Sequence, residues 1–168
     1  MKFIFRQLSS FAAPILFCIV IPYLIVVSRS GASLSSVFNP SPFFAILGLL
    51  VCLAGLAGFI LTVRMLIQIG RGTIMPWDPA RRLVTGSLYA YVRNPMILSV
   101  ILIEAGEAIL FASYWLGLLA VLFFVINTLY FTFSEEPGLE KRFGQEYVEY
   151  KEHVPRWIPR LTPWHPGE

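Results

Sequence analysis

The stretch NPMILSVILIEAGEAILFASYWLGLLAVLFFVINTLYFTFS, residues 94–134, decides the fold of this chain. Of its 41 residues, only Glu104 and Glu107 carry a charge. At about 1.5 Å per residue, a helix of this length reaches roughly 60 Å, twice the ~30 Å hydrocarbon core of a bilayer. Two crossings need a tight turn, which we place at residues 112–115, because Tyr and Trp favour the membrane interface. The stretch predicts a hairpin of two membrane-spanning helices.

The composition of the whole chain extends this prediction. Of its 168 residues, 57% are hydrophobic and 14% are charged, whereas a soluble domain carries about 25% charged residues. Two more runs, residues 11–27 and 42–63, lack any charge. We therefore expect a single all-α membrane domain over residues 1–168, a polytopic helical bundle with a C-terminal amphipathic interfacial helix. Its four predicted spans cover about residues 11–28, 42–66, 96–112 and 115–134.

The basic residues predict the orientation of these spans. Four spans place 12 of the 13 Lys and Arg residues on one side of the membrane, which should be cytoplasmic. Both termini would then be cytoplasmic, and the first apolar run is read as a retained span, not a signal peptide. A bacterial inner membrane is the expected location. Cys18 and Cys52 lie in apolar runs and are read as small buried hydrophobic residues, so no metal site is predicted.

Two cytoplasmic segments are predicted to fold outside the bilayer. Residues 70–95 are too polar and too rich in Gly and Pro to span, and are expected to form a folded loop. After residue 134, which should cap the next helix, Leu139, Phe143, Tyr147 and Tyr150 recur on one helical face. This helix is expected either at the cytoplasmic interface or folded back over the bundle. Three tryptophans on this side are read as interface anchors: Trp77, Trp157 and Trp164.

Two polar clusters flank the hairpin. Arg93-Asn94-Pro95 opens its first arm, and Glu135-Glu136 follows its second. Each has a structural explanation by itself: Asn94 caps a helix that begins with Pro95, and the acids favour a helix N-terminus. The hairpin brings both clusters to one corner, however. A helix N-terminus, a guanidinium, an amide and two carboxylates there suit a zwitterionic cofactor.

The residues around both clusters resemble a known family. LVTGSLYAYVRNPMILS (83–99) looks like the LVTxGxYxxxRHPxYxG segment of integral-membrane methyltransferases, and EEPGLEKRFGQEYVEYKEHVPRWIPR (135–160) looks like their EExxLxxxFGxxYxxYxxxVPRxxP tail. That family includes isoprenylcysteine carboxyl methyltransferases and phospholipid N-methyltransferases. The resemblance implies the cofactor S-adenosylmethionine, with the C-terminal helix closing over it. The implied cofactor-binding residues are Arg81, Arg82, Leu83, Val84, Tyr89, Arg93, Asn94, Pro95, Met96, Ile97, Glu135 and Glu136.

Three positions depart from the family pattern. The family's His is Asn94 here, and the Tyr after it is Ile97. The arginine that is thought to meet the carboxylate substrate of the carboxyl methyltransferases is Phe131 here. The resemblance therefore implies a lipid-like or hydrophobic small acceptor, with carboxyl O-methylation and amine N-methylation both open. The lipid bilayer is the other expected partner, and nucleic acid is not one.

Glu104 and Glu107 lie three residues apart in the first arm of the hairpin. An ionised acid at mid-membrane depth costs about 2.5–3.5 kcal/mol, so both should face the bundle interior. They either make a structural polar contact or act as catalytic residues that position or deprotonate the acceptor. Two other functions stay open: a non-catalytic binding or assembly module of the same family, and a small transporter that uses this acid pair.

Overall fold

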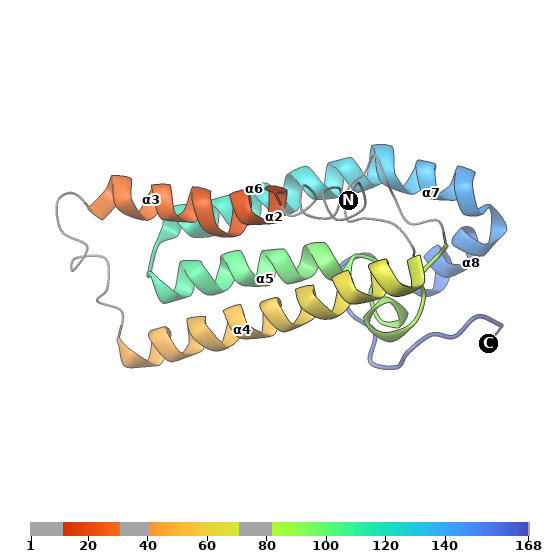
Figure 1. Cartoon of the computed structure of the whole chain (residues 1–168), viewed down its shortest axis with the longest axis horizontal. Coiled ribbons are helices and arrows are strands. Elements are labelled where there is room, and N and C mark those ends of the chain that lie inside the picture. Colours follow the sequence, from red (N-terminus) through yellow and green to blue (C-terminus); the bar gives the residue numbers. More distant parts are fainter. Residues whose placement is uncertain (1–11, 31–40, 71–81, 168) are drawn as a thin grey trace, which may run out of the picture. The chain divides into compact units, whose positions relative to one another are not determined.

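The computed structural model describes residues 12–30, 41–70 and 82–167, and every regular element in these ranges is helical. Figure 1 shows the helices in chain order. The chain divides into two compact units. Unit 1 comprises Met1–Ala57 and Ser99–Val125, and unit 2 comprises Gly58–Leu98 and Ile126–Glu168. That both units act as one membrane-embedded domain stays a prediction.

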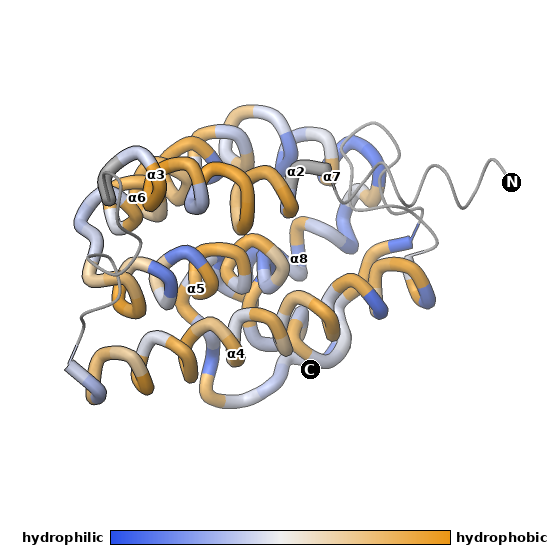
Figure 2. Tube along the Cα trace, turned by 60° about the vertical axis from the view of Figure 1, so that its left-hand side comes forward, coloured by the Kyte–Doolittle hydropathy of each residue, from blue (hydrophilic) through white to orange (hydrophobic). Residues whose placement is uncertain are grey.

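A helix stands at each of the four predicted spans. The first consists of α2 (Ala12–Ile15), a π-helical turn (Leu16–Val20) and α3 (Ile21–Ser30). The others are α4 (Pro42–Met65), α5 (Pro95–Leu110) and α6 (Tyr114–Tyr130). Two continuous helices, Pro42–Gly70 and Tyr114–Phe143, are long and apolar enough to cross a membrane. Hydrophobic residues line α4 and α6, whereas hydrophilic ones gather in α7 and α8 (Figure 2). Membrane crossing by the other two helices stays a prediction.

Glycines set the close approach of α4 and α5 within unit 1. A Cβ atom on Gly106 would lie 2.5 Å from the sulfur of Cys52 and 2.7 Å from its backbone nitrogen. A Cβ on Gly48 would lie 2.5 Å from the backbone nitrogen of Leu110. Small residues let helix backbones pack this closely where lipid supplies no hydrophobic drive for association. Cys52 also donates to the carbonyl of Ile103 at 3.5 Å.

The predicted turn of the hairpin is confirmed. It lies between the end of α5 at Leu110 and the start of α6 at Tyr114. Ala112 adopts a positive φ of 47°, which reverses the chain in few residues. The N–H of Ser113 donates to the carbonyl of Ala108 at 2.9 Å and closes the turn.

The predicted helix end at Ser134 is wrong. The helix that starts at Tyr114 runs on through a π-helical turn (Phe131–Glu135) into α7 (Glu136–Phe143). Pro137 explains the π turn, because proline has no N–H for the α-helical ladder and needs extra room for its ring. Glu135 has helical φ and ψ values of −67° and −54°, and no side chain caps α7.

The predicted C-terminal amphipathic helix is in fact two helices. α7 ends at Gly144, whose φ of 57° favours glycine, and α8 spans Gln145–His153. The four predicted face residues nevertheless meet in one core. Tyr147, Tyr150, Val154 and Trp164 form a buried cluster, against which Leu83, Leu139 and Phe143 pack. Unit 2 therefore buries this face within itself, and Trp164 is a core residue, not the predicted interface anchor. Trp77 lies outside the described residues.

Candidate functional site

α5 begins at the predicted proline. Pro95 is its first residue, and the carbonyl of Asn94 accepts the N–H of Leu98 at 3.0 Å. Proline suits this position because the first helical N–H has no partner within the helix. Backbone N–H groups at a helix N-terminus also favour anions, through their free donors and the helix dipole.

The C-terminal tail holds the loop that precedes α5. The backbone N–H of Arg93 donates to the carbonyl of Pro155 at 2.9 Å. Arg160 and Trp164 donate in the same way to the carbonyls of Tyr91 and Ala90, at 2.9 and 3.0 Å. Residues 90–93 and the tail therefore form one backbone-paired structure, which fixes the position of the Arg93 side chain.

The same loop is braced by tyrosines of α8. The hydroxyl of Tyr150 donates to the carbonyl of Tyr89 at 2.7 Å. Burial raises the pKa of Tyr89 and of Tyr150, and it raises the pKa of Tyr147 to about 12. All three phenols are therefore neutral hydrogen-bonding groups at physiological pH.

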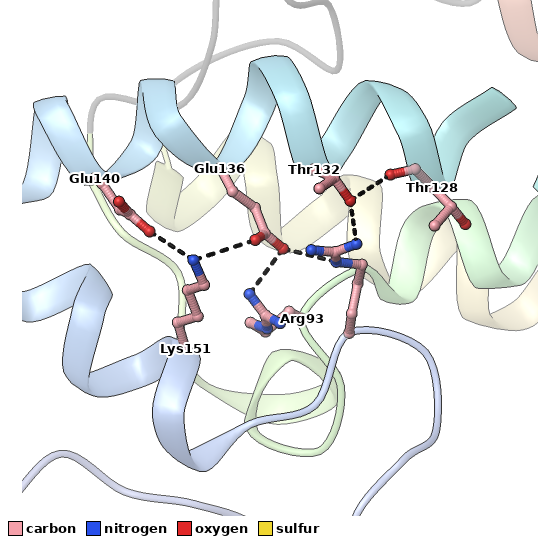
Figure 3. A network of polar contacts seen from close by, with 7 residues as sticks. Arg93, Thr128, Thr132, Glu136, Glu140 and Lys151 are labelled. Carbon is pink, nitrogen blue, oxygen red and sulfur yellow. Dashed lines mark hydrogen bonds and ion pairs between the residues drawn. The ribbon is translucent and has the colours of Figure 1, made fainter. Parts of the chain in front are cut away.

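Glu136 is the centre of an ion-pair network in unit 2 (Figure 3). Its Oε1 accepts from Arg93 Nη1 at 2.8 Å and from Arg156 Nε at 2.7 Å. Lys151 Nζ lies 3.5 Å from Oε2 and also pairs with Glu140 at 2.7 Å. The Glu136 side chain is only 5% exposed, against 11% for Arg93 and 20% for Arg156. One carboxylate thus joins α7 to the loop before α5, to α8 and to the tail.

The two neighbouring acids have different surroundings. Glu135 is half-buried, and its Oε2 accepts from the hydroxyl of Tyr130 at 3.1 Å. No salt bridge is recorded for it among the described residues. Of the predicted acid pair, Glu136 pairs with internal cations, whereas within the described residues Glu135 accepts only the hydroxyl of Tyr130.

Two buried donors next to this network lack acceptors. Neither Arg93 Nε nor Asn94 Nδ2 has a hydrogen-bond partner within the part of the chain that the structure describes. A buried donor without an acceptor costs about 1–3 kcal/mol, and it marks a position where a ligand can gain that energy. Both donors stand at the N-terminus of α5, where an anion is already favoured.

The structure places the remaining predicted cofactor residues unevenly. Met96 and Ile97 lie in the first turn of α5, beside Asn94. Val84 is buried, and Leu83 packs on the core of unit 2, whereas Arg82 is exposed. Arg81 lies outside the described residues. The structure therefore gathers Arg93 to Ile97, Glu135 and Glu136 in unit 2, and gives Leu83 and Val84 a packing role.

Glu104 and Glu107 belong to unit 1. Glu104 is 1% exposed, and neither of its carboxylate oxygens has a hydrogen-bond partner among residues 12–30, 41–70 and 82–167. Oε2 of Glu107 is likewise unpaired within those ranges. Cys18 is close enough to interact electrostatically with both acids. The described residues therefore give Glu104 no hydrogen-bond partner, and both the structural and the catalytic reading of the pair stay predictions.

Arg156 and Lys151 are site residues that the sequence did not single out. Arg156 belongs to the VPR motif of the family-like tail, so the sequence marked this position but did not indicate that it pairs with Glu136. Its Nη1 also donates to the hydroxyl of Thr132 at 2.6 Å. Lys151 lies on the charged side of a helix, where a solvated lysine is the ordinary expectation.

One comparison with known proteins gives the family of this chain. A family model described as phospholipid methyltransferase matches residues 43–146. The match includes α4, α5, α6 and α7 with Arg93, Asn94 and both acids, and it ends before Lys151 and Arg156. No curated protein and no solved structure matches the chain. Because the model covers well over half of the sequence, the chain belongs to the phospholipid methyltransferase family, and it is a membrane methyltransferase by that membership.

Proposed function

We propose that this protein transfers a methyl group from S-adenosylmethionine to a hydrophobic or lipid-like acceptor, and that the cofactor binds in unit 2 at the N-terminus of α5. The observation that carries the proposal is a pair of buried donors, Arg93 Nε and Asn94 Nδ2, which find no acceptor among the described residues. Methyltransferases of this family generally use S-adenosylmethionine.

The residues present suit this cofactor. Its carboxylate would accept from Arg93 Nε and Asn94 Nδ2 and would gain from the dipole of α5. Its ammonium or ribose hydroxyls would find an acceptor in Glu135. Glu136 would act indirectly, because its salt bridge fixes the guanidinium of Arg93. Replacement of the family's histidine by Asn94 keeps a donor at this position.

The cofactor supplies an electrophilic methyl group on a sulfonium. The chain has to hold donor and acceptor in line and exclude water, which needs no covalent nucleophile. The ring of Phe131 lies 6.1 Å from that of Trp157, so an apolar contact occupies the position where carboxyl methyltransferases have an arginine. We propose an apolar acceptor on these grounds, with a carboxyl oxygen or an amine nitrogen as the methylated atom.

The charge distribution supports a cytoplasmic position for this site. Unit 2 carries ten of the 13 Lys and Arg residues of the chain. A four-span topology would place these ten on the cytoplasmic side. The cofactor would then enter from the cytosol, and the acceptor would arrive through the bilayer.

Asn94→Asp tests the proposal most sharply. Asp caps helices as well as Asn does, so folding is preserved, while the donor becomes a carboxylate that repels the cofactor carboxylate. Calorimetry on the purified full chain should show S-adenosylmethionine binding that this variant weakens about tenfold or more. Gln145→Glu is the matched control, because it makes the same amide-to-acid change at the exposed start of α8.

Two outcomes would contradict the proposal. Equal binding by wild type and Asn94→Asp would place the cofactor elsewhere. No binding by a folded wild-type sample would favour a non-catalytic or transport function, and the buried Glu104 without a hydrogen-bond partner in the described chain would then be the group to study.

A further inference from the structure

The segment that follows α8 is fastened to the long apolar helix within unit 2. Arg156 reaches both Thr132 and Glu136 on that helix. The ring of Trp157 packs edge-on against Phe131 of the same helix, with an interplanar angle of 84°. Residues 156 and 157 therefore lie beside residues 131–136.

Residues 131–136 mark the place where this helix changes character. The helix carries no charged residue from Tyr114 to Ser134, and its first acids are Glu135 and Glu136. A membrane-spanning helix leaves the hydrocarbon where its apolar run ends and charged residues begin. If this helix crosses the membrane as its composition predicts, the tail fastened to it would lie at the level of the membrane–water boundary.

Two large apolar side chains come directly after this attachment, and both point away from the protein. Ile158 is 79% exposed and Leu161 is 99% exposed. Phe133, on the neighbouring stretch of the helix, is exposed as well. Single exposed apolar side chains are common on soluble proteins, but these two stand at the boundary of an apolar span. Ile158, Leu161 and Phe133 are thus three large apolar side chains left exposed in this part of unit 2.

The backbone around them is held in place, so their exposure does not come from a loose end. Arg160 donates through its backbone N–H to Tyr91 and through Nη1 to the carbonyl of His153 at 3.0 Å. Trp164, further on, is buried in the core of unit 2. Pro159 and Pro163 restrict the remaining rotations. The chain between these anchor points presents both Ile158 and Leu161.

We propose that residues 158–161 insert into the headgroup–acyl boundary of the bilayer and that lipid covers Ile158 and Leu161. Insertion of apolar side chains about 5–10 Å into this boundary is the usual depth of interfacial segments. Arg156, before this segment, and Arg160, within it, suit the phosphate level of the headgroups. The insertion would hold the tail, and with it the Arg93 loop, at a constant height relative to the bilayer surface.

Site-specific fluorescence on the reconstituted full chain tests this proposal. In a background with Cys18→Ala and Cys52→Ala, a single cysteine at Leu161 or at Ile158 carries an environment-sensitive dye in phosphatidylcholine–phosphatidylglycerol vesicles. Glu152→Cys on the exposed side of α8 is the matched control. Lipids with a spin label near the headgroup should quench the dyes at 158 and 161 strongly, and aqueous iodide should quench them several-fold less than the dye at 152.

Either of two results would overturn the proposal. Iodide quenching at 161 equal to that at 152 would mean that water covers this side chain. Protection from both iodide and spin-labelled lipid would mean that protein covers it, either another part of this chain or a second copy. Thermal unfolding of each labelled protein, compared with its unlabelled background, shows whether the label has disturbed the fold, and the two labelled positions provide independent readings.

Discussion

Replacement of Glu136 by Gln should destabilise unit 2 more than any other single loss of charge in the described chain. The substitution keeps the volume of the side chain and removes the charge that Arg93 and Arg156 share at 2.8 and 2.7 Å. Both guanidinium groups would stay mostly buried with no counter-ion in place. The change therefore isolates the electrostatic contribution of one carboxylate.

The expected magnitude follows from the burial of the network. Removing one partner of a buried ion pair costs about 3–5 kcal/mol. We expect the lower end, about 3 kcal/mol, because Arg156 is partly exposed and the Gln amide oxygen still accepts a hydrogen bond. Loss of the Lys151–Glu136 pair adds little, because Lys151 lies 3.5 Å from Oε2, is 39% exposed and keeps Glu140 as a partner at 2.7 Å. For a chain of this size, about 3 kcal/mol lowers Tm by about 6–12 °C.

Glu135→Gln is the control, since it makes the same chemical change one residue away. Glu135 accepts only a partly exposed tyrosine hydroxyl in the described structure, so its loss should cost less than about 1 kcal/mol. Tryptophan fluorescence during thermal unfolding in detergent or nanodiscs measures both variants, because Trp157 and Trp164 lie in unit 2. Equal melting temperatures for the two variants would refute the assignment of Glu136 as the buried hub. A larger loss of stability in Glu135→Gln would reverse the roles given to the two acids.

Two further predictions concern packing and pH. Gly106→Ala should lower the stability of unit 1 by about 1–3 kcal/mol, because the new methyl meets the backbone of Cys52. Gly117→Ala is the control, because its methyl would lie 4.0 Å from the Cβ of Ala108 and should not lower the stability of unit 1. Equal melting temperatures for the two variants would contradict the close approach of α4 and α5. The free energy of unfolding should fall as pH rises from about 10 to about 12. Burial in the folded state raises the pKa of Tyr147 from 10.0 to about 12. Between these two pH values the unfolded chain loses the Tyr147 proton before the folded chain does, which favours unfolding. Urea unfolding at several pH values measures this, and Tyr147→Phe should flatten the decline; an unchanged slope in that variant would exclude Tyr147 as its source.

Local sequence was sufficient to predict the four long apolar helices and the start of α5 at Pro95. Long apolar runs with few charges predict helices at about residues 11–28, 42–66, 96–112 and 115–134, and helices stand there. The turn near Ala112 and the start of α5 at Pro95 follow from the preferences of single residues, as does the family resemblance from short motifs. These features depend on residues a few positions apart, so they can be predicted from the order of residues alone.

The wrong predictions rest on the preferences of single residues, which tertiary packing or a π-helical turn outweighs. Ser134 is a reasonable cap followed by acids, but a π-helical turn accommodates Pro137 and lets the helix continue. Trp164 is typical of an interface anchor, yet its ring lies 5.6 Å from that of Tyr150 in the core of unit 2. Periodicity placed four residues on one helical face, but it did not reveal the break at Gly144 or the burial of that face.

By itself, the sequence determined that this is a helical membrane protein of the methyltransferase type, because charge density, apolar run length and motif spacing are properties of the chain in order. Only the tertiary structure decided which of two adjacent acids is the internal counter-ion of two arginines and which accepts only a tyrosine hydroxyl within the described residues. That choice depends on Arg93, 43 residues before Glu136, and on Arg156, 20 residues after it. Folding brings both guanidinium groups within hydrogen-bond distance of the Glu136 carboxylate. Because this carboxylate is only 5% exposed, leaving it unpaired would cost free energy, so the ion pairs are required.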